Sequence, residues 1–333
     1  MFVCKVTGAA SADGRCPAMM DVGSINATSE KWQVAGTDLG ITWEADDTTL
    51  LVAFGDSFRD PTSNDPVAKD WRSNTLALST DKNLHDGMTV NFMVEDWPGH
   101  ARQFIARTPG FAADQEATVI PTAAIAIGAR SYVHFMSVAK WGARGIWSTN
   151  YSALVYSDDR GESWTRAGGV RWSGDSKFAM AAFAKMDGFV YVFGTPSGRF
   201  GGVRLARVAE ASLLDPAAYE YFAGDGYRKS EAAAASIVLS SVGELSVQRH
   251  KKRGTWLMTY LNQPRQAIVL RTADRPEGPW GEERVLLDTS DQAHPNLYGG
   301  YMHPWGLEED ALYLTVSKSR CYNVFLVRVP IAL

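Results

Sequence analysis

Two aspartates, Asp38 and Asp56, have the residue type and the setting for general acid–base chemistry. Asp38 lies inside the apolar run 34–43, and Asp56 follows the apolar part of the run 50–58. Two carboxyl groups held close together in a partly desolvated site separate in proton affinity, so that one can donate a proton and the other can accept one. For either residue alone, a role as a turn former at a strand end is the alternative.

The segments around the aspartates belong to a repeat of short β-type runs. Runs of one kind recur at 50–56, 131–137, 189–195, 255–261 and 311–317. Each is preceded, across a short polar turn, by a second kind of run, and is followed by a third. Five copies of an antiparallel unit predict an all-β fold, a five-bladed β-propeller with a central funnel, whose C-terminal run 322–333 closes the ring beside the first blade. The best helical candidate is one short stretch, 227–236.

This arrangement places the two aspartates on one face of the ring. In an antiparallel pair, the start of the first run and the end of the second lie at the same edge of the blade, and the innermost runs line the channel. A propeller funnel is a concave place for a ligand to bind. The residues expected near the starts of the five innermost runs are Asp38, Thr122, Met180, Glu244 and His303.

Long loops on the same face supply groups that bind sugars. They follow the second runs of the first three units and contain Trp71, Arg72, Asn74, Trp141, Trp147 and Arg199. Tryptophan rings can stack on sugar faces, and the arginines can donate to hydroxyls, although Arg199 could instead pair with a neighbouring acid. Most of the 11 tryptophans must fill the blade interfaces, and we expect Trp43, Trp164, Trp256 and Trp280 in the core.

Two further patterns have structural readings. Residues 157–164 fit the Ser-x-Asp-x-Gly-x-Ser-Trp turn known as the Asp-box, in which Asp159 stabilises the turn through side-chain-to-backbone hydrogen bonds. Of the three cysteines, Cys4 and Cys16 could close a small N-terminal loop, and free thiols are the alternative.

Composition excludes several classes of function. The formal charge of −4 and the scattered basic residues argue against nucleic acid, and no apolar run is long enough to cross a bilayer. The first residues lack the order of a secretory signal, so export by another route or a place in a virion is expected if the substrate is extracellular. No segment has the ligand spacing of a metal site, and we predict no catalytic metal and no cofactor.

The motifs together resemble one family along nearly the whole chain. The stretches "GTDLGITW", "FGDSF", "WRSN", "VIPTAAI", "YVHFMSVAKWG", "WSTNYSALVYSDDRGESW", "GELSV" and "YGGYMHPW" are similar to domain-of-unknown-function family 4185, also grouped as glycoside hydrolase family 183, of actinobacteria and their phages. The resemblance extends from about Val34 to Val329. We therefore divide the chain into an N-terminal segment, 1–30, outside the match, and a single propeller catalytic domain, 31–333.

The resemblance implies endo-D-arabinanase activity on the arabinogalactan and lipoarabinomannan of mycobacterial cell walls, with D-arabinan as the partner molecule and virion proteins as further partners if the chain is phage-encoded. Its acidic pair matches Asp38 and Asp56. We assign Asp38 as base and Asp56 as acid, in an order that the sequence does not fix, with Glu244 as a modulator of their proton affinity or as the acid itself. Inversion of configuration is implied, with carboxyl groups about 6.5–9.5 Å apart.

Tyr301 and His303, in "YGGYMHPW", join the expected substrate-binding residues, and a packed, hydrogen-bonded histidine is the alternative for His303. Two other functions need the same fold. A carbohydrate-binding propeller, such as a phage tail adhesin, would use the aromatic loops but not the acids. A structural virion component would use neither.

Overall fold

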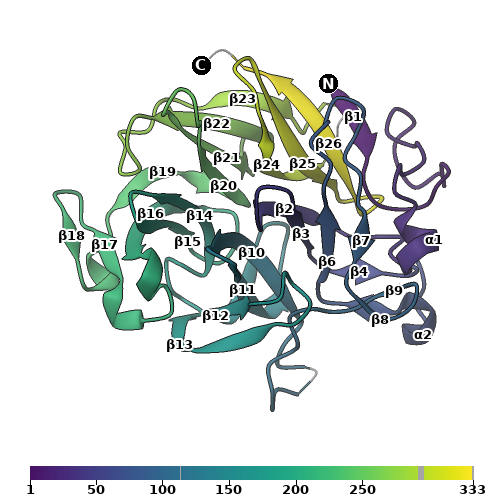
Figure 1. The fold of residues 1–333 in the computed structure, drawn as a ribbon, viewed down its shortest axis with the longest axis horizontal. Helices are drawn as coiled ribbons and strands as arrows, with labels where there is room; N and C mark the ends of the chain where they lie inside the picture. The colour runs from purple at the N-terminus through teal and green to yellow at the C-terminus, as the bar shows by residue number, and fades with distance from the viewer. Residues whose placement is uncertain (113, 292–295, 332–333) are drawn as a thin grey trace.

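The computed structural model describes residues 1–112, 114–291 and 296–331. Five antiparallel sheets surround a central channel, and Figure 1 looks along that channel. The innermost strands contact one another in the order β2, β10, β14, β20, β24 and back to β2. The predicted all-β, five-bladed propeller is confirmed.

The first two blades follow the predicted order of runs from the channel outward. Blade I contains β2 (Leu39–Glu44), β3 (Leu50–Phe54), β6 (Thr75–Ser79) and β7 (Phe92–Met93). Blade II contains β10 (Thr118–Ile127), β11 (Arg130–Trp141), β12 (Trp147–Ser157) and β13 (Thr165–Ser173).

The remaining blades repeat this order, with extra strands at the outer edge of blade III and with the N-terminal strand as the outer strand of blade V. Blade III contains β14 (Met180–Met186), β15 (Phe189–Thr195), β16 (Gly201–Ala209), β17 (Glu220–Phe222) and β18 (Tyr227–Arg228), with β19 (Ser236–Val242) also paired to β16. Blade IV contains β20 (Leu245–Arg249), β21 (Trp256–Asn262), β22 (Ala267–Ala273) and β23 (Arg284–Asp288). Blade V contains β24 (Leu297–Leu307), β25 (Ala311–Lys318), β26 (Asn323–Pro330) and, outermost, β1 (Phe2–Lys5).

Helices are few and short. The stretch 227–236 is the best helical candidate from the sequence, but it holds the end strand β18, the single 3₁₀ turn η3 (Glu231–Ala233) and the first residue of β19. One turn between two paired strands is too short to offset the cost of helix nucleation. The other short elements are α1 (Thr28–Trp32), α2 (Pro66–Lys69), η1 (Glu210–Ser212), η2 (Pro216–Ala218), β4 (Ser57–Phe58), β5 (Trp71–Arg72), β8 (Glu95–Trp97) and β9 (His100–Ala101). Within the described ranges no helix is long and apolar enough to cross a membrane.

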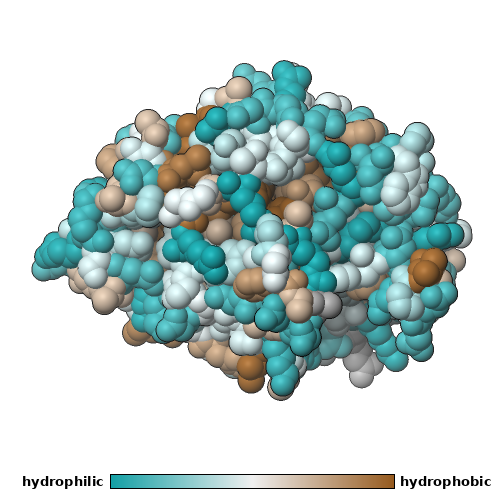
Figure 2. Space-filling model, turned by 90° about the horizontal axis from the view of Figure 1, so that it is seen from below, coloured by the Kyte–Doolittle hydropathy of each residue, from teal (hydrophilic) through white to brown (hydrophobic). Residues whose placement is uncertain are grey.

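The two ends of the chain close the ring together. β1 pairs antiparallel with β26, so the N-terminal segment supplies the outer strand of the last blade. Blades V and I then share one apolar cluster, to which Val6, Leu326 and Val52 contribute. Because a closed ring leaves no open side between its first and last blades, this cluster ties the whole propeller together. The edge of the disc, seen in Figure 2, is mainly hydrophilic with smaller hydrophobic areas between the polar side chains.

The Asp-box turn is confirmed as a structural feature. Asp159 Oδ1 accepts hydrogen bonds from the Ser163 backbone N–H at 2.8 Å and from the Ser157 hydroxyl at 2.8 Å. The predicted core tryptophans also pack as expected: Trp43, Trp256 and Trp280 are buried, and the half-buried Trp164 packs edge-on against Trp43.

The cysteines pair differently from the suggested N-terminal loop. Cys16 forms a disulfide with Cys321, at the end of the turn after β25, and the suggested Cys4–Cys16 pairing is therefore wrong. Cys4 is free and buried because its strand β1 packs it into the cluster between blades V and I. Burial raises the pKa of the Cys4 thiol to about 11, so this thiol is unreactive at neutral pH.

The closure of the ring can be tested with a matched pair of substitutions. Val6 is fully buried in the closing cluster, whereas Val22 is 38% exposed. Val6→Asp places an unpaired charge in that cluster, and we expect a loss of more than about 3 kcal/mol in the free energy of unfolding. Val22→Asp should change it by less than about 0.5 kcal/mol. Equal effects in urea unfolding would show that the packing of the N-terminal segment in this cluster does not stabilise the ring.

Candidate active site

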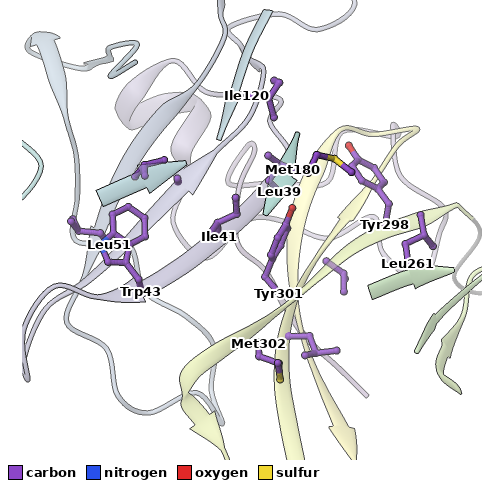
Figure 3. Packing of buried hydrophobic residues seen from close by; sticks show 14 of the residues in the cluster. Leu39, Ile41, Trp43, Leu51, Ile120, Met180, Leu261, Tyr298, Tyr301 and Met302 are labelled. Atoms are coloured by element: carbon purple, nitrogen blue, oxygen red, sulfur yellow. The ribbon is translucent and has the colours of Figure 1, made fainter. Parts of the chain in front are cut away.

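A pocket of about 100 Å³ lies at the mouth of the channel, on the face where the innermost strands begin. It is lined by Asp38, Leu39, Asp56, Ile120, Pro121, Thr122, Met136, Trp141, Trp147, Met180, Ala181, Arg199, Glu244, Leu245, Tyr298, Tyr301 and Tyr322. Figure 3 shows Leu39 of β2 and Met180 of β14 near Tyr298 and Tyr301, which both belong to β24. The site is therefore a small, mostly apolar chamber with a few polar groups.

A bulge at the start of β2 places Asp38 in this pocket. Leu39 and Gly40 both have left-handed backbone conformations, with φ of 68° and 83°, and the register of β2 against β3 shifts between Leu39 and Ile41. The bulge leaves the Leu39 N–H outside the strand ladder, and it donates instead to the Ser317 hydroxyl of blade V at 2.8 Å. Asp38 thus depends on both the first and the last blade.

The position of the Asp38 carboxyl requires a glycine between β3 and Asp56. A Cβ atom at Gly55 would lie 2.2 Å from Asp38 Oδ1, so any other residue there would displace this carboxyl. The Gly55 N–H also donates to the Asp38 carbonyl at 3.1 Å. Asp38 therefore packs directly on the backbone that leads into Asp56.

The environment of Asp38 favours its protonated form. Burial is the largest cause, and the negative charge of Asp56 adds to it; together they raise the pKa of Asp38 to about 7. The Tyr298 hydroxyl, which donates to Asp38 Oδ2 at 2.8 Å, and a weaker side-chain interaction with Tyr322 oppose this shift. Asp38 can therefore hold or release a proton near neutral pH.

Asp56 is better stabilised as a carboxylate. Its Oδ1 accepts hydrogen bonds from the Thr118 hydroxyl at 2.6 Å and from Trp71 Nε1 at 2.9 Å. Burial raises the pKa of Asp56 to about 6, and these two bonds and the charge of Lys69 oppose the shift. The two acids thus have separate proton affinities, as general acid–base catalysis requires.

Glu244 forms an ion pair instead of acting as a third free acid. Arg199 Nε donates to Glu244 Oε1 at 2.9 Å, and Arg199 Nη1 donates to Gln263 at 3.1 Å. The guanidinium also lies over the Tyr298 ring, 5.2 Å from its centroid. The alternative of a pairing role for Arg199 is therefore found in the structure, together with a place for both residues in the pocket wall.

Three pocket-lining side chains have a buried polar atom without a hydrogen-bond partner among the described residues: Asp38 Oδ1, Glu244 Oε2 and Trp147 Nε1. Buried polar groups in proteins are nearly always paired, and such atoms in a pocket indicate partners supplied by a ligand or by water. Two acceptors and one donor around an apolar chamber suit a molecule that carries several hydroxyl groups.

Most of the predicted site residues come together. Asp38, Asp56, Glu244, Thr122, Trp141, Trp147, Arg199 and Tyr301 all line the pocket. Trp141 stands at the rim, 46% exposed, and meets Trp147 edge-on at 5.5 Å between ring centroids. The Thr122 hydroxyl is engaged by His134 Nδ1 at 2.6 Å, so Thr122 contributes mainly shape to the wall.

Trp71, Arg72 and Asn74 do not line the pocket. Trp71 stands behind Asp56 and acts on it through the indole N–H. Arg72 is buried and donates to the backbone carbonyls of Ala101 and Gln33. Asn74 is also buried, and its amide pairs with backbone groups at Phe104, Ile105 and Val119. The expected sugar contacts of Arg72 and Asn74 are corrected accordingly, because the backbone of a folded-back loop takes up their hydrogen bonds.

His303 does not reach the pocket either. β24 begins at Leu297, so His303 lies in the middle of the strand and not near its start. It is fully buried, with Nδ1 accepting the Trp305 N–H at 3.3 Å, and burial lowers its pKa to about 3. A packed histidine, the alternative stated above, is the observed role.

Three contributors were not predicted. Tyr298 takes the place that was expected for His303, and its signal was available in the same "YGGYMHPW" motif. Thr118 bonds Asp56 from the start of β10. Tyr322 enters from the turn after β25, and no spacing in the sequence points to it.

A second cavity, of about 400 Å³, opens on the opposite side of the channel. It is lined by the later parts of the innermost strands, and Glu44, which pairs with Lys251, is the one acid among the described residues that line it. Since the described lining holds no pair of acids, we place the candidate active site in the smaller pocket. In the described part of the chain, no group of three or more His, Cys, Asp or Glu residues could hold a metal ion.

Comparison with known proteins identifies relatives of the whole propeller. The family described as "Domain of unknown function (DUF4185)" matches residues 23–328. Notoamide biosynthesis cluster protein J' of Aspergillus versicolor is 30% identical over 316 residues, which cover 89% of this chain and 84% of that protein. Protein J of an Aspergillus strain is 29% identical over 318 residues, covering 89% and 83%.

Solved structures share the fold. A presumed hydrolase of Bacteroides ovatus superposes with a TM-score of 0.62 at 14% identity, covering 91% of this chain and 87% of that one. An exo-β-1,3-galactanase of Phanerochaete chrysosporium gives 0.54 at 12% identity, covering 98% and 63%. An arabinanase of Bacillus subtilis gives 0.51 at 10% identity, covering 88% and 96%.

The raised pKa of Asp38 predicts that the folded protein becomes more stable when this carboxyl group is removed. With a pKa near 7 in the folded state and about 3.9 unfolded, the folded protein holds a proton that the unfolded chain releases, so stability falls as the pH rises from 4 to 7. Asp38→Asn cannot ionise and should be more stable than wild type at pH 8 by roughly 2–4 kcal/mol, and equally stable at pH 4. Exposed Asp47→Asn is the control. Thermal unfolding at both pH values measures the difference, and no gain at pH 8 would contradict the proton affinity described here.

Proposed function

The chain belongs to the DUF4185 family, and from this membership and the geometry of the pocket we propose that it is a glycoside hydrolase that cuts internal α-D-arabinofuranosidic bonds of cell-wall arabinan. The observation that carries the proposal is the pair of carboxyl groups, Asp38 and Asp56, that line one chamber with pKa values raised to about 7 and 6, together with the unpartnered polar atoms of Glu244 and Trp147 in its wall. The resemblance to glycoside hydrolase family 183 supports the arabinan substrate. The fold, shared with a galactanase and an arabinanase, is compatible with it.

The two acids take different roles. Asp56, with two hydrogen bonds that favour its ionised form, is the base, and Asp38, with the higher pKa, is the acid. This order reverses the assignment made from the sequence, which had no means of ranking the two environments. Asp56 removes a proton from a water molecule as its oxygen attacks the anomeric carbon, and Asp38 gives its proton to the departing glycosidic oxygen as that bond breaks. The products are a hemiacetal of inverted configuration and an alcohol.

The rest of the pocket binds the sugar. The free oxygen of Glu244 accepts from a ring hydroxyl, and the free indole N–H of Trp147 donates to another. Trp141, exposed at the rim, offers a ring face to a neighbouring sugar of the polymer. Apolar residues such as Met180 keep bulk water away from the acids, which preserves their raised pKa values. The enzyme would act on the cell wall, outside the cell that makes the polymer, and would meet virion proteins if it is carried by a phage.

A second candidate function has its own support. The relatives at about 30% identity are named after the biosynthesis of notoamide, and the pocket is small and lined mostly by apolar and aromatic side chains. Acid–base catalysis on a small apolar molecule would use the same two aspartates. A polysaccharide-binding propeller without catalysis would use the aromatic residues and not the acids.

Purified arabinogalactan distinguishes these functions. The wild-type protein should release oligosaccharides, measured as new reducing ends, and both Asp38→Asn and Asp56→Asn should reduce the rate by at least about 10³-fold, because general acid and base groups each contribute about 10²–10⁴-fold and act together here. Asp47→Asn should keep the full rate.

Three outcomes would contradict the proposal in different ways. Full activity in either active-site variant would remove the acid pair from the mechanism. Binding of the polymer without new reducing ends would favour a binding module, and neither binding nor cleavage of arabinan would favour the small-molecule function.

The pH dependence follows from the proton affinities of the pair. Activity requires Asp56 ionised and Asp38 protonated, so kcat/KM should rise through an apparent pKa of about 6 and fall through one of about 7. Initial rates between pH 4 and 9 test this expectation. A rate that stays constant from pH 7 to 9 would exclude Asp38 as the acid.

A further inference from the structure

The segment that leads into Asp38 is held by a turn of blade V. The Tyr322 carbonyl accepts the Thr37 N–H at 2.7 Å, and Asn323 Nδ2 donates to the Ala35 carbonyl at 3.0 Å. The Tyr322 side chain lines the pocket beside Asp38. One short turn therefore bonds the backbone just before Asp38 and also places a tyrosine side chain against the Asp38 carboxyl.

The N-terminal segment also bonds the backbone that leads into Asp38. Arg15 Nη2 donates to the Ala35 carbonyl at 2.9 Å, the same oxygen that Asn323 contacts. The next residue, Cys16, is bonded to Cys321, the residue before Tyr322. The disulfide thus joins the two segments that bond the backbone before Asp38, and both of its cysteines are buried.

The backbone around this junction needs external support. Leu39 and Tyr322 have left-handed conformations, with φ of 68° and 54°, which cost free energy for residues other than glycine. Such conformations persist where surrounding structure holds them. Hydrogen bonds from Leu39 to Ser317 and from the Tyr322 N–H to the Lys318 carbonyl, at 2.8 Å each, supply part of that support.

We propose that the Cys16–Cys321 disulfide positions the acid. It holds Tyr322 against Asp38, and opening it lowers the catalytic rate without unfolding the propeller. The inference rests on the proposed function only for its catalytic consequence. The N-terminus stays anchored without the disulfide, because β1 pairs with β26 and the Val6 N–H donates to the Val324 carbonyl at 2.8 Å. What the disulfide adds is therefore local to the turn and to the segment around Arg15.

Opening the disulfide has a definite chemistry and a definite direction. A dithiol reductant supplies two electrons and two protons, the two cysteines become thiols, and the reductant becomes a cyclic disulfide. Since the interaction with Tyr322 lowers the pKa of Asp38, releasing Tyr322 should raise it. Loss of alignment should also lower kcat, since small misplacements of reacting groups are costly.

The test compares Cys16→Ser/Cys321→Ser with Tyr322→Phe, and with Cys4→Ala as the control for a buried cysteine outside the junction. Thermal unfolding first checks that each variant folds. Titration of the Asp38 carboxyl by ¹³C NMR, with no substrate present, should show a higher pKa in the serine double variant and in Tyr322→Phe, with no further rise when the two are combined. On arabinogalactan, kcat should fall about tenfold, with KM nearly unchanged. Cys4→Ala should behave as wild type.

Several results would overturn the inference. They are an unchanged Asp38 titration in the folded double variant, a shift to lower pKa, and shifts that add when the variants are combined. If the serine variant does not fold, wild type reduced by dithiothreitol after folding is measured instead, under the same criteria. Because the titration needs no substrate, a protein that cleaves no arabinan but shows the expected shift would refute the proposed function and support the positioning role.

Discussion

The contact between the Asp38 carboxyl and the backbone at Gly55 is the constraint on which the rest of the site depends. It packs Asp38 on the backbone that leads into Asp56, in a place where burial raises the pKa of both carboxyls and the charge of Asp56 raises the pKa of Asp38 further. The contact exists because the β2 bulge turns Asp38 inward and because Gly55 has no side chain. Such a site destabilises the fold locally, and the surrounding structure must offset that cost.

Closure of the ring supplies much of that compensation. Blade V bonds the β2 bulge through Ser317, and the Thr315 hydroxyl donates to the Gly40 carbonyl at 2.6 Å. Tyr298 of the same blade donates to Asp38 itself. The first and last blades are far apart in the sequence and adjacent in space, so the interface that completes the propeller also builds the acid pair. Stability of the ring and geometry of the site are therefore coupled.

The sequence predicted the parts of this arrangement that follow from local pattern. Alternating runs and polar turns predict five antiparallel units, and the start of one run with the end of the next predicts that Asp38 and Asp56 share a face. It could not predict contacts made only in three dimensions, such as Tyr322 on Asp38 or Cys16 with Cys321. The place of His303 in its strand was predicted wrongly. Two left-handed glycines, Gly299 and Gly300, are part of β24, which therefore begins earlier in the sequence than its apolar pattern indicates.

The division of labour between the aspartates follows from hydrogen bonding more than from burial. Burial is the largest influence on both carboxyls and would by itself make them alike. Thr118 and Trp71 donate to one oxygen of Asp56, and the charge of Lys69 also favours its ionised form. Asp38 accepts from Tyr298 through Oδ2, but it experiences the charge of Asp56 and its Oδ1 has no partner among the described residues. An acid with a free oxygen in the pocket can reach a substrate, while a carboxylate fixed by two donors keeps its orientation for activating water. The difference between the two environments therefore matches the two roles in the cleavage of the glycosidic bond, proton donation by Asp38 and activation of water by Asp56.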